Sequence, residues 1–308
     1  MKKILAIAIA TAISAPAMAD LTIGGSARYQ VTDTDGTTAT AGRVQIDVKG
    51  SSTADNGAFA SYQGTVNFNM GENRTQAVNA ATGTTAVSSV YTVTENVSFD
   101  NVTLTLGNAA ANVQLGEFET FKAFSSGADT FEAATLSGAT AAIGGYENSS
   151  IFGRNSGNIQ VNVTAIEGVT LNAATRIQDA DSAIQIGAGA TFGGVAVAAM
   201  YEDDATSANN GMTVTAGTTF EGVAVNASYG KKGANKSSNI NFSYAGFGLA
   251  FQNNEGAYNV EEDRVFGSYT VEDVAGVAGA DVIIGGGNAS TAAGADKDVV
   301  GVRLSYAF

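Results

Sequence analysis

The sequence predicts an all-β fold, a transmembrane antiparallel β-barrel of about sixteen strands. Three observations predict this fold class. Apolar and polar residues alternate along most of the chain, two-residue turns that contain glycine recur at a regular spacing, and the alternating runs match the ~9–11 residues that a tilted strand needs to cross a bilayer. Beyond the N-terminal segment, no apolar run approaches the ~20 residues of a membrane-spanning helix. Counts of fourteen or eighteen strands stay open.

The N-terminal segment is expected to be removed before the chain folds. It has Lys2 and Lys3, then a short apolar run, and it ends in Ala17-Met18-Ala19, which is the pattern of a secretory signal peptide with its cleavage site. We therefore assign residues 1–19 to a signal peptide and residues 20–308 to the barrel. The mature chain would have 289 residues (308 minus 19), and loss of the two lysines would change its formal net charge from −14 to −16.

The strand elements follow from residue parity, because successive side chains of a strand point to opposite faces. In the first run, Ile23 and Tyr29 share an apolar face, and Arg28 and Gln30 share the polar face. The run 90–106 keeps this alternation if it contains a bulge near Asp100. The expected strands are 21–31, 42–50, 58–69, 90–106, 112–118, 157–166, 169–177, 182–192, 195–202, 211–220, 223–230, 238–245, 247–253, 260–271, 279–286 and 297–308.

Three segments repeat a hairpin pattern, in which an apolar residue precedes Glu-Gly or Gly-Gly and an alternating run follows. The turns are Glu167-Gly168, Gly193-Gly194 and Glu221-Gly222, with 26 and then 28 residues from one second glycine to the next. Glycine supplies the positive φ that tight primed turns need. A period of about 26 residues leaves nine or ten residues for each strand and one longer loop, as expected for consecutive antiparallel hairpins.

A soluble β-sandwich is the alternative to a membrane barrel, because its strands alternate in the same way. A sandwich does not need aromatic residues at its strand ends. Here Tyr201 and Tyr229 close two strands, and Phe192 and Phe220 precede two turns, as in the aromatic girdles at the two edges of a membrane. Backbone groups in lipid have no water partner, so we expect the last strand to pair with the first.

The composition narrows the classes of function. The chain has no His and no Cys, so it lacks the usual general base, the usual thiol nucleophile and the best ligands for transition metals. A Ser-His-Asp hydrolase is excluded, and we expect no enzyme, no metal and no cofactor. The chain is acidic and has no strong basic tract, which argues against nucleic acid as a partner.

The sequence resembles the general diffusion porins of Gram-negative bacteria over essentially the whole mature chain. The resemblance rests on the signal peptide, the alternating strands, the terminal LSYAF and the segment GRNSGN at 153–158. It implies an outer-membrane homotrimer that lets small hydrophilic solutes and ions diffuse passively and that contacts membrane lipid and lipopolysaccharide. It also implies that Tyr306 and Phe308 belong to a C-terminal signal read by the barrel-assembly machinery.

The porin family folds a long third loop into the lumen, where acidic residues face arginines of the wall. By this resemblance, 119–158 is the candidate constriction loop, Asp129 and Glu132 are its pore-facing acids, and Arg154 belongs to the basic wall. A solvated external loop stays open as the alternative for the two acids, because loops are commonly polar. The residues that parity assigns to the lumenal face are Arg28, Arg43, Lys49, Arg176 and Arg303.

The net charge of −16 predicts a weakly cation-selective channel. External acidic loops would weaken this inference, because physiological salt screens charges over ~8–10 Å. Two other functions stay open, a substrate-specific outer-membrane channel and a structural or adhesive barrel with a plugged lumen. The absence of Trp argues against an aromatic track for sugars.

Overall fold

The computed structural model describes residues 20–77, 88–123, 155–177, 183–203, 210–256, 262–291 and 296–308. These residues form sixteen β-strands and one short 3-10 helix, η3 (Val274–Gly276). The expected signal peptide at 1–19 and three of the expected pore residues, Asp129, Glu132 and Arg154, lie outside the described residues. Within the described ranges, no helix is long and apolar enough to cross a membrane.

The strands alternate in direction through the whole chain. In chain order they are β1 (Thr22–Thr34), β2 (Thr37–Thr53), β3 (Phe59–Ala77), β4 (Ser88–Gly107), β5 (Ala111–Phe118), β6 (Asn155–Val163), β7 (Val169–Arg176), β8 (Ile184–Phe192), β9 (Val195–Asp203), β10 (Gly211–Phe220), β11 (Val223–Lys232), β12 (Asn235–Tyr244), β13 (Phe247–Glu255), β14 (Glu262–Val271), β15 (Ala280–Thr291) and β16 (Lys297–Ala307).

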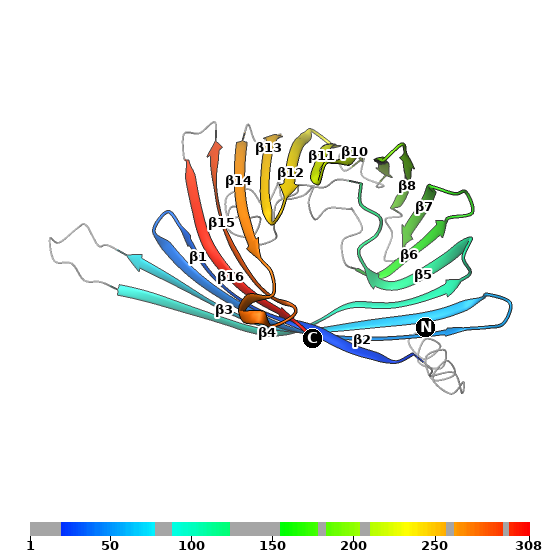
Figure 1. The fold of residues 1–308 in the computed structure, drawn as a ribbon, viewed down its shortest axis with the longest axis horizontal. Coiled ribbons are helices and arrows are strands. Elements are labelled where there is room, and N and C mark those ends of the chain that lie inside the picture. Colours follow the sequence, from blue (N-terminus) through cyan, green and yellow to red (C-terminus); the bar gives the residue numbers. More distant parts are fainter. Residues whose placement is uncertain are drawn as a thin grey trace.

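Each strand pairs with its neighbours in sequence, and β1 pairs with β16, so the sheet is a closed barrel (Figure 1). The predicted antiparallel barrel of sixteen strands is confirmed. At the seam, the Gly25 amide donates to the Phe308 carbonyl at 2.9 Å, and the Phe308 amide donates back to the Gly25 carbonyl at 3.0 Å. Closure leaves no free sheet edge, which is what a sheet needs in lipid.

The barrel has its polar residues inside and its apolar residues outside. On β1, Gln30 and Thr32 are 8% and 3% exposed, whereas Tyr29 and Val31 between and beside them are 48% and 39% exposed. Strand β16 repeats the pattern, since Arg303 is buried and the flanking apolar residues are exposed. An apolar outer face of this extent suits lipid rather than water.

A β-bulge keeps β4 in this pattern, near Asp100 as predicted. Two residues of β4, Asn101 and Val102, stand opposite the single Gly64 of β3. Asn101 has a φ of 52°, a conformation that asparagine tolerates better than most residues. Because the extra residue shifts the parity, Phe99 before the bulge and Val102 after it both remain on the exposed outer face.

Two of the three predicted two-residue turns are present. Both residues of Gly193-Gly194 and of Glu221-Gly222 have positive φ, as a type I′ turn requires. The prediction for Glu167-Gly168 is wrong in length, because β6 ends at Val163 and residues 164–168 form a longer connection. Thr164 explains the difference: its hydroxyl and amide donate to the carbonyls of residues 109 and 110 in the neighbouring turn, at 2.7 and 2.8 Å.

Three strands extend beyond their predicted bounds by five residues or more at one end. Strand β2 begins at residue 37 rather than 42, β3 continues to 77 rather than 69, and β15 continues to 291 rather than 286. The extensions carry mostly Gly, Ala, Thr and Asn, without the apolar alternation that lipid imposes. Their backbone pairing continues all the same, so side-chain parity underestimates strand length beyond the apolar band.

Candidate functional site: the barrel lumen

Two of the predicted lumenal arginines lie directly opposite each other across β1 and β2. Arg28 pairs with Arg43 in the strand register. Arg28 is two residues from the buried Gln30, so both share the inner face. Gln30 in turn accepts hydrogen bonds from Nε and Nη2 of Arg303 on β16, each at 3.3 Å. The seam of the barrel therefore brings three arginines together on adjacent strands of the inner wall.

Two carboxylates lie on the same inner face, in a row four residues along β2 from Arg43. Asp47 of β2 accepts hydrogen bonds from the Thr65 hydroxyl at 2.6 Å and from the Gln45 amide at 3.0 Å. On β4, Asp100 accepts a hydrogen bond from the Asn67 amide. Charged groups held by neutral donors keep fixed positions, so this part of the wall presents a row of negative charge about 13 Å along the strands from the arginines.

The other predicted basic residues lie apart from this group. Lys49 is exposed near the end of β2, six residues beyond Arg43, or about 20 Å at ~3.3 Å per residue. Arg176 is the last residue of β7, where it pairs with Asn158 of β6. The structure therefore brings Arg28, Arg43 and Arg303 together, and it does not bring Lys49 or Arg176 to them.

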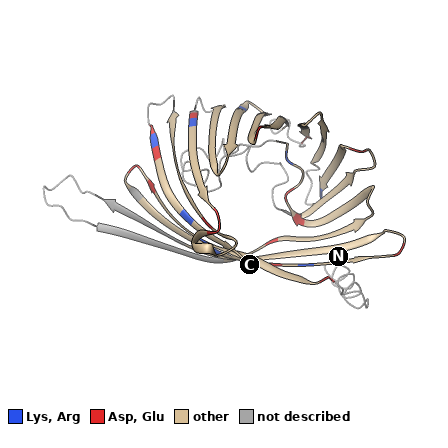
Figure 2. Cartoon of the chain, viewed as in Figure 1, with Lys and Arg blue, Asp and Glu red and all other residues tan. Residues whose placement is uncertain are grey.

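Charged residues are spread over many of the described strands and turns (Figure 2). By parity with buried neighbours, the strand residues of the inner face include the basic residues Arg28, Arg43, Lys49, Arg176, Lys232, Arg264, Lys297 and Arg303 and the acidic residues Asp47, Asp100, Glu202 and Asp281. The outer face of the strands carries the acidic residues Asp33, Asp203, Glu255, Asp263 and Asp298 and the basic residues Lys231 and Lys236. Much of the negative charge of the described chain thus lies outside the lumen.

Arg264 is an inner-wall residue that the sequence analysis did not assign. It lies on β14 opposite Gln252 of β13, and both side chains are buried. The parity of residues 262–269 contained the signal, because Val265 and Tyr269 mark the apolar face and Arg264 falls on the other. Three adjacent acids precede Arg264, within the expected strand 260–271.

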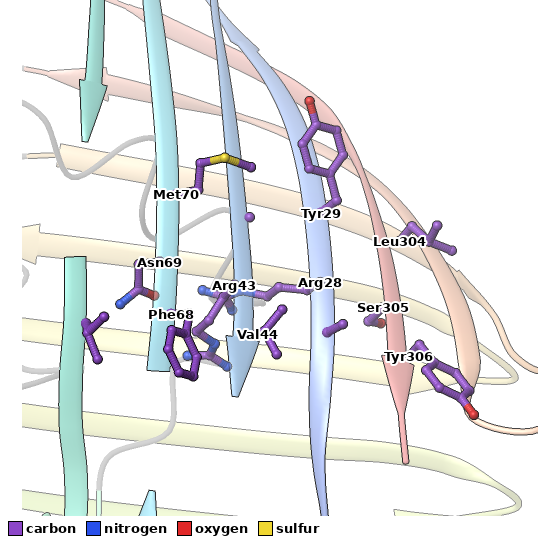
Figure 3. Close-up of a pocket in the computed structure, with 13 residues that line it drawn as sticks. Arg28, Tyr29, Arg43, Val44, Phe68, Asn69, Met70, Leu304, Ser305 and Tyr306 are labelled. Carbon is purple, nitrogen blue, oxygen red and sulfur yellow. The ribbon is translucent and has the colours of Figure 1, made fainter. Parts of the chain in front are cut away.

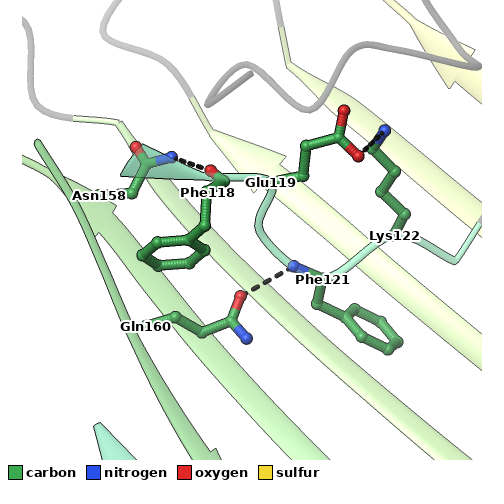
Figure 4. A network of polar contacts seen from close by, with 6 residues as sticks. All are labelled: Phe118, Glu119, Phe121, Lys122, Asn158 and Gln160. Atoms are coloured by element: carbon green, nitrogen blue, oxygen red, sulfur yellow. Dashed lines mark hydrogen bonds and ion pairs between the residues drawn. The ribbon is translucent and has the colours of Figure 1, made fainter. Parts of the chain in front are cut away.

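The chain that leaves β5 turns against the inner wall (Figure 4). The amide of Asn158 donates to the Phe118 carbonyl at 2.7 Å, and the backbone amide of Phe121 donates to the Gln160 side chain at 2.8 Å. Asn158 and Gln160 are buried residues of the inner face of β6. Residues 119–123 therefore lie on the lumenal side of β6, at the start of the predicted constriction segment 119–158.

On the opposite face of the wall, β16, β1, β2 and β3 form an apolar groove of about 770 Å³ (Figure 3). Its lining includes the small residues Ala27 and Gly42, the larger apolar residues Tyr29, Phe68, Met70 and Tyr306, and also Arg28, Arg43, Asn69 and Ser305. The groove has free space at Gly42. A Cβ added there would make only ordinary van der Waals contacts, the nearest at 3.6 Å to Met70.

Comparison with known proteins identifies the family. A sequence model described as Gram-negative porin matches residues 6–308. The chain belongs to the Gram-negative porin family. Among solved structures, several variants of the Rhodopseudomonas blastica porin resemble this porin. One variant is 16% identical with a TM-score of 0.59, covering 94% of this chain and 100% of the other. A triple mutant is 17% identical with a TM-score of 0.57, covering 93% and 100%. No curated protein sequence matches the chain.

Family and fold together establish the general function. This porin is an outer-membrane channel for passive diffusion of small hydrophilic solutes and ions. The inner wall of polar side chains offers hydrogen bonds to water and to polar solutes, and a barrel of about sixteen strands leaves an aqueous channel.

Proposed function

We propose that this porin narrows its lumen between the segment after β5 and the basic wall at the β16–β1–β2 seam. The observation that carries the proposal is the attachment of residues 119–123 to the inner face of β6. In this proposal, residues 119–158 form the constriction region, Asp129 and Glu132 face the pore, and Arg154 joins Arg28 and Arg43 on the basic side. Lys49 and Arg176 line wider parts of the lumen.

Opposed charges across a narrow water-filled passage select solutes by their polarity. Fixed positive and negative groups produce a transverse field that orders water and aligns dipolar solutes. An apolar solute gains nothing from the field and has to displace the ordered water. Passage is driven only by the concentration gradient, so the proposed mechanism needs no cofactor and no catalytic residue.

Weak cation selectivity remains a prediction. The net charge that motivates it is a property of the whole chain, and much of the negative charge of the described strands lies on their outer face. Permeant ions respond to charges within about a Debye length, ~8–10 Å, of their path. Selectivity for cations therefore requires the predicted acids of the constriction region to outweigh the basic inner wall.

Assembly and targeting complete the proposal. Residues 1–19 direct export and are cleaved after Ala19, and Tyr306 and Phe308 present the C-terminal signal to the barrel-assembly machinery. Three copies associate through the apolar groove around Ala27 and Gly42, whose free space suits close packing of a neighbouring barrel. Membrane lipid and lipopolysaccharide cover the rest of the outer face.

Single-channel recording in planar bilayers under a salt gradient tests the proposal. The mature protein should insert as a trimer with conductance steps in triplets, and the sign of the reversal potential gives the ion preference. A stable conductance that a sugar or another nutrient blocks at low concentration would favour a substrate-specific channel. Folded protein without conductance would leave a plugged structural barrel as the better account.

A further inference from the structure

An aromatic ring from the segment after β5 lies on a glycine of the inner wall. A Cβ built on Gly187 would lie 2.6 Å from Cε1 of Phe121 and closer still to Cδ1. Gly187 belongs to the inner face of β8, two residues from the buried Gln185 and opposite the buried Asn172 of β7. The ring therefore occupies the space that any side chain at position 187 would need.

We propose that Phe121 and Gly187 form the positioning contact that holds the segment 119–123 against the wall and so sets the open cross-section of the lumen. The inference rests on the proposed function, because it concerns the segment that begins the constriction region. The two hydrogen bonds to Asn158 and Gln160 attach the segment to β6 alone. The contact of the ring with Gly187 extends the attachment across β7 to β8. Two points of attachment fix the direction in which residues 119–123 run along the wall, as well as the place where the segment leaves β5.

The burial of residues in the segment indicates that it has a fixed position against the wall. Thr120 and Ala123 are each 2% exposed, and Glu119 and Lys122 pair with each other at 2.8 Å. The side chains of Asn158 and Gln160 are buried, but both of their hydrogen bonds join the segment to β6. The ring of Phe121 supplies the contact with β8, so its loss should free the segment from that strand.

Strand β8 provides a matched control for a test. Gly189 is two residues from Gly187 on the same inner face, and a Cβ there would be no closer than 3.8 Å to any atom. Neither glycine has a positive φ. Gly187→Val and Gly189→Val thus add the same group to the same strand and face, but only Gly187→Val collides with Phe121.

Accessibility of Ala123 reports the position of the segment independently of current. The chain has no cysteine, so Ala123→Cys gives a single thiol that a small, pore-permeant methanethiosulfonate reagent can modify in refolded trimers. We expect slow modification in the otherwise wild-type chain and with Gly189→Val. With Gly187→Val or Phe121→Ala we expect modification about tenfold faster, as for a local opening, together with a lower and noisier single-channel conductance.

The outcomes separate the inference from the proposed function. Equal modification rates for Gly187→Val and Gly189→Val in folded, conducting protein would overturn the positioning role and leave the porin function intact. A wild-type chain that folds and does not conduct would instead overturn the proposed function. The double variant Gly187→Val with Phe121→Ala should be less disturbed than the sum of the two, because valine then fills space that the ring has left.

Discussion

Arg28 and Arg43 are the residues whose charge should affect permeation most directly. They face each other on adjacent strands of the inner wall, with Arg303 one strand away. Two positive charges in direct register repel a cation and attract an anion at the same place. Their position at the seam was predictable from the sequence, since parity alone assigns both to the polar face of their strands.

Replacing both arginines by glutamine should make the channel more permeable to cations. We expect the permeability ratio of cation to anion to rise about twofold for Arg28→Gln with Arg43→Gln, whatever the sign of the wild-type preference. The measurement is the reversal potential under a salt gradient. Lys49→Gln is the control, because Lys49 is exposed near the strand end and about 20 Å along β2 from Arg43. An equal shift from Lys49→Gln would contradict a local effect of the arginine pair.

At the scale of the strand, parity predicts faces well and boundaries less well. It identified all sixteen strands and the bulge near Asp100, because lipid on one side and water on the other impose alternation on every residue between them. It missed the extensions of β2, β3 and β15, where only backbone pairing persists. It also could not predict the contact of Phe121 with Gly187, since that contact joins residues far apart in sequence and leaves no periodic signal.

The β4 bulge can be tested by removing its extra residue. Deletion of Asn101 would restore simple pairing with β3, because Val102 would then stand opposite Gly64 while Thr103 keeps its place opposite Gln63. Val102 and Leu104 would still face the lipid and Thr103 the lumen. We therefore expect the heat-resistant folded form seen on cold electrophoresis to persist.

Asn101→Gly is the control for this deletion. It keeps the residue count and the positive φ, and glycine adopts that φ without strain. The folded form should persist with a free energy of unfolding equal to the wild type or higher by up to about 1 kcal/mol. Loss of the folded form in the deletion variant, with Asn101→Gly intact, would show that β4 needs the bulge for more than the accommodation of one extra residue.

For the whole molecule, net charge predicts less than the distribution of charge. The net charge of −14 for the full chain bears on solubility, and it includes charges of the loops at the ends of the barrel. Among the described strands, most of the basic residues lie on the inner face, whereas the acidic residues are divided between the two faces. The sequence contains this separation, because parity assigns each charged residue to a face, whereas the summed charge conceals it. The field along the permeation path must therefore be inferred strand by strand.

Closure of the barrel depends on a glycine at the seam. A Cβ on Gly25 would overlap the backbone oxygen of Gln45 and would lie 3.0 Å from the ring of Phe308. Gly25→Ala should therefore strain the pairing of β1 with both neighbours and destabilise the barrel by on the order of 1–3 kcal/mol. Gly64→Ala is the matched control, since nothing lies within 4 Å of a Cβ there, and it should change stability by less than about 0.5 kcal/mol.

The temperature at which the folded form disappears on electrophoresis measures this difference. A lower temperature for Gly25→Ala alone would mean that close approach at the seam limits the stability of the whole barrel, because sixteen strands in one closed sheet unfold from their weakest pair. Equal temperatures for Gly25→Ala and Gly64→Ala would mean that β1 can move away from Gln45 without opening the barrel.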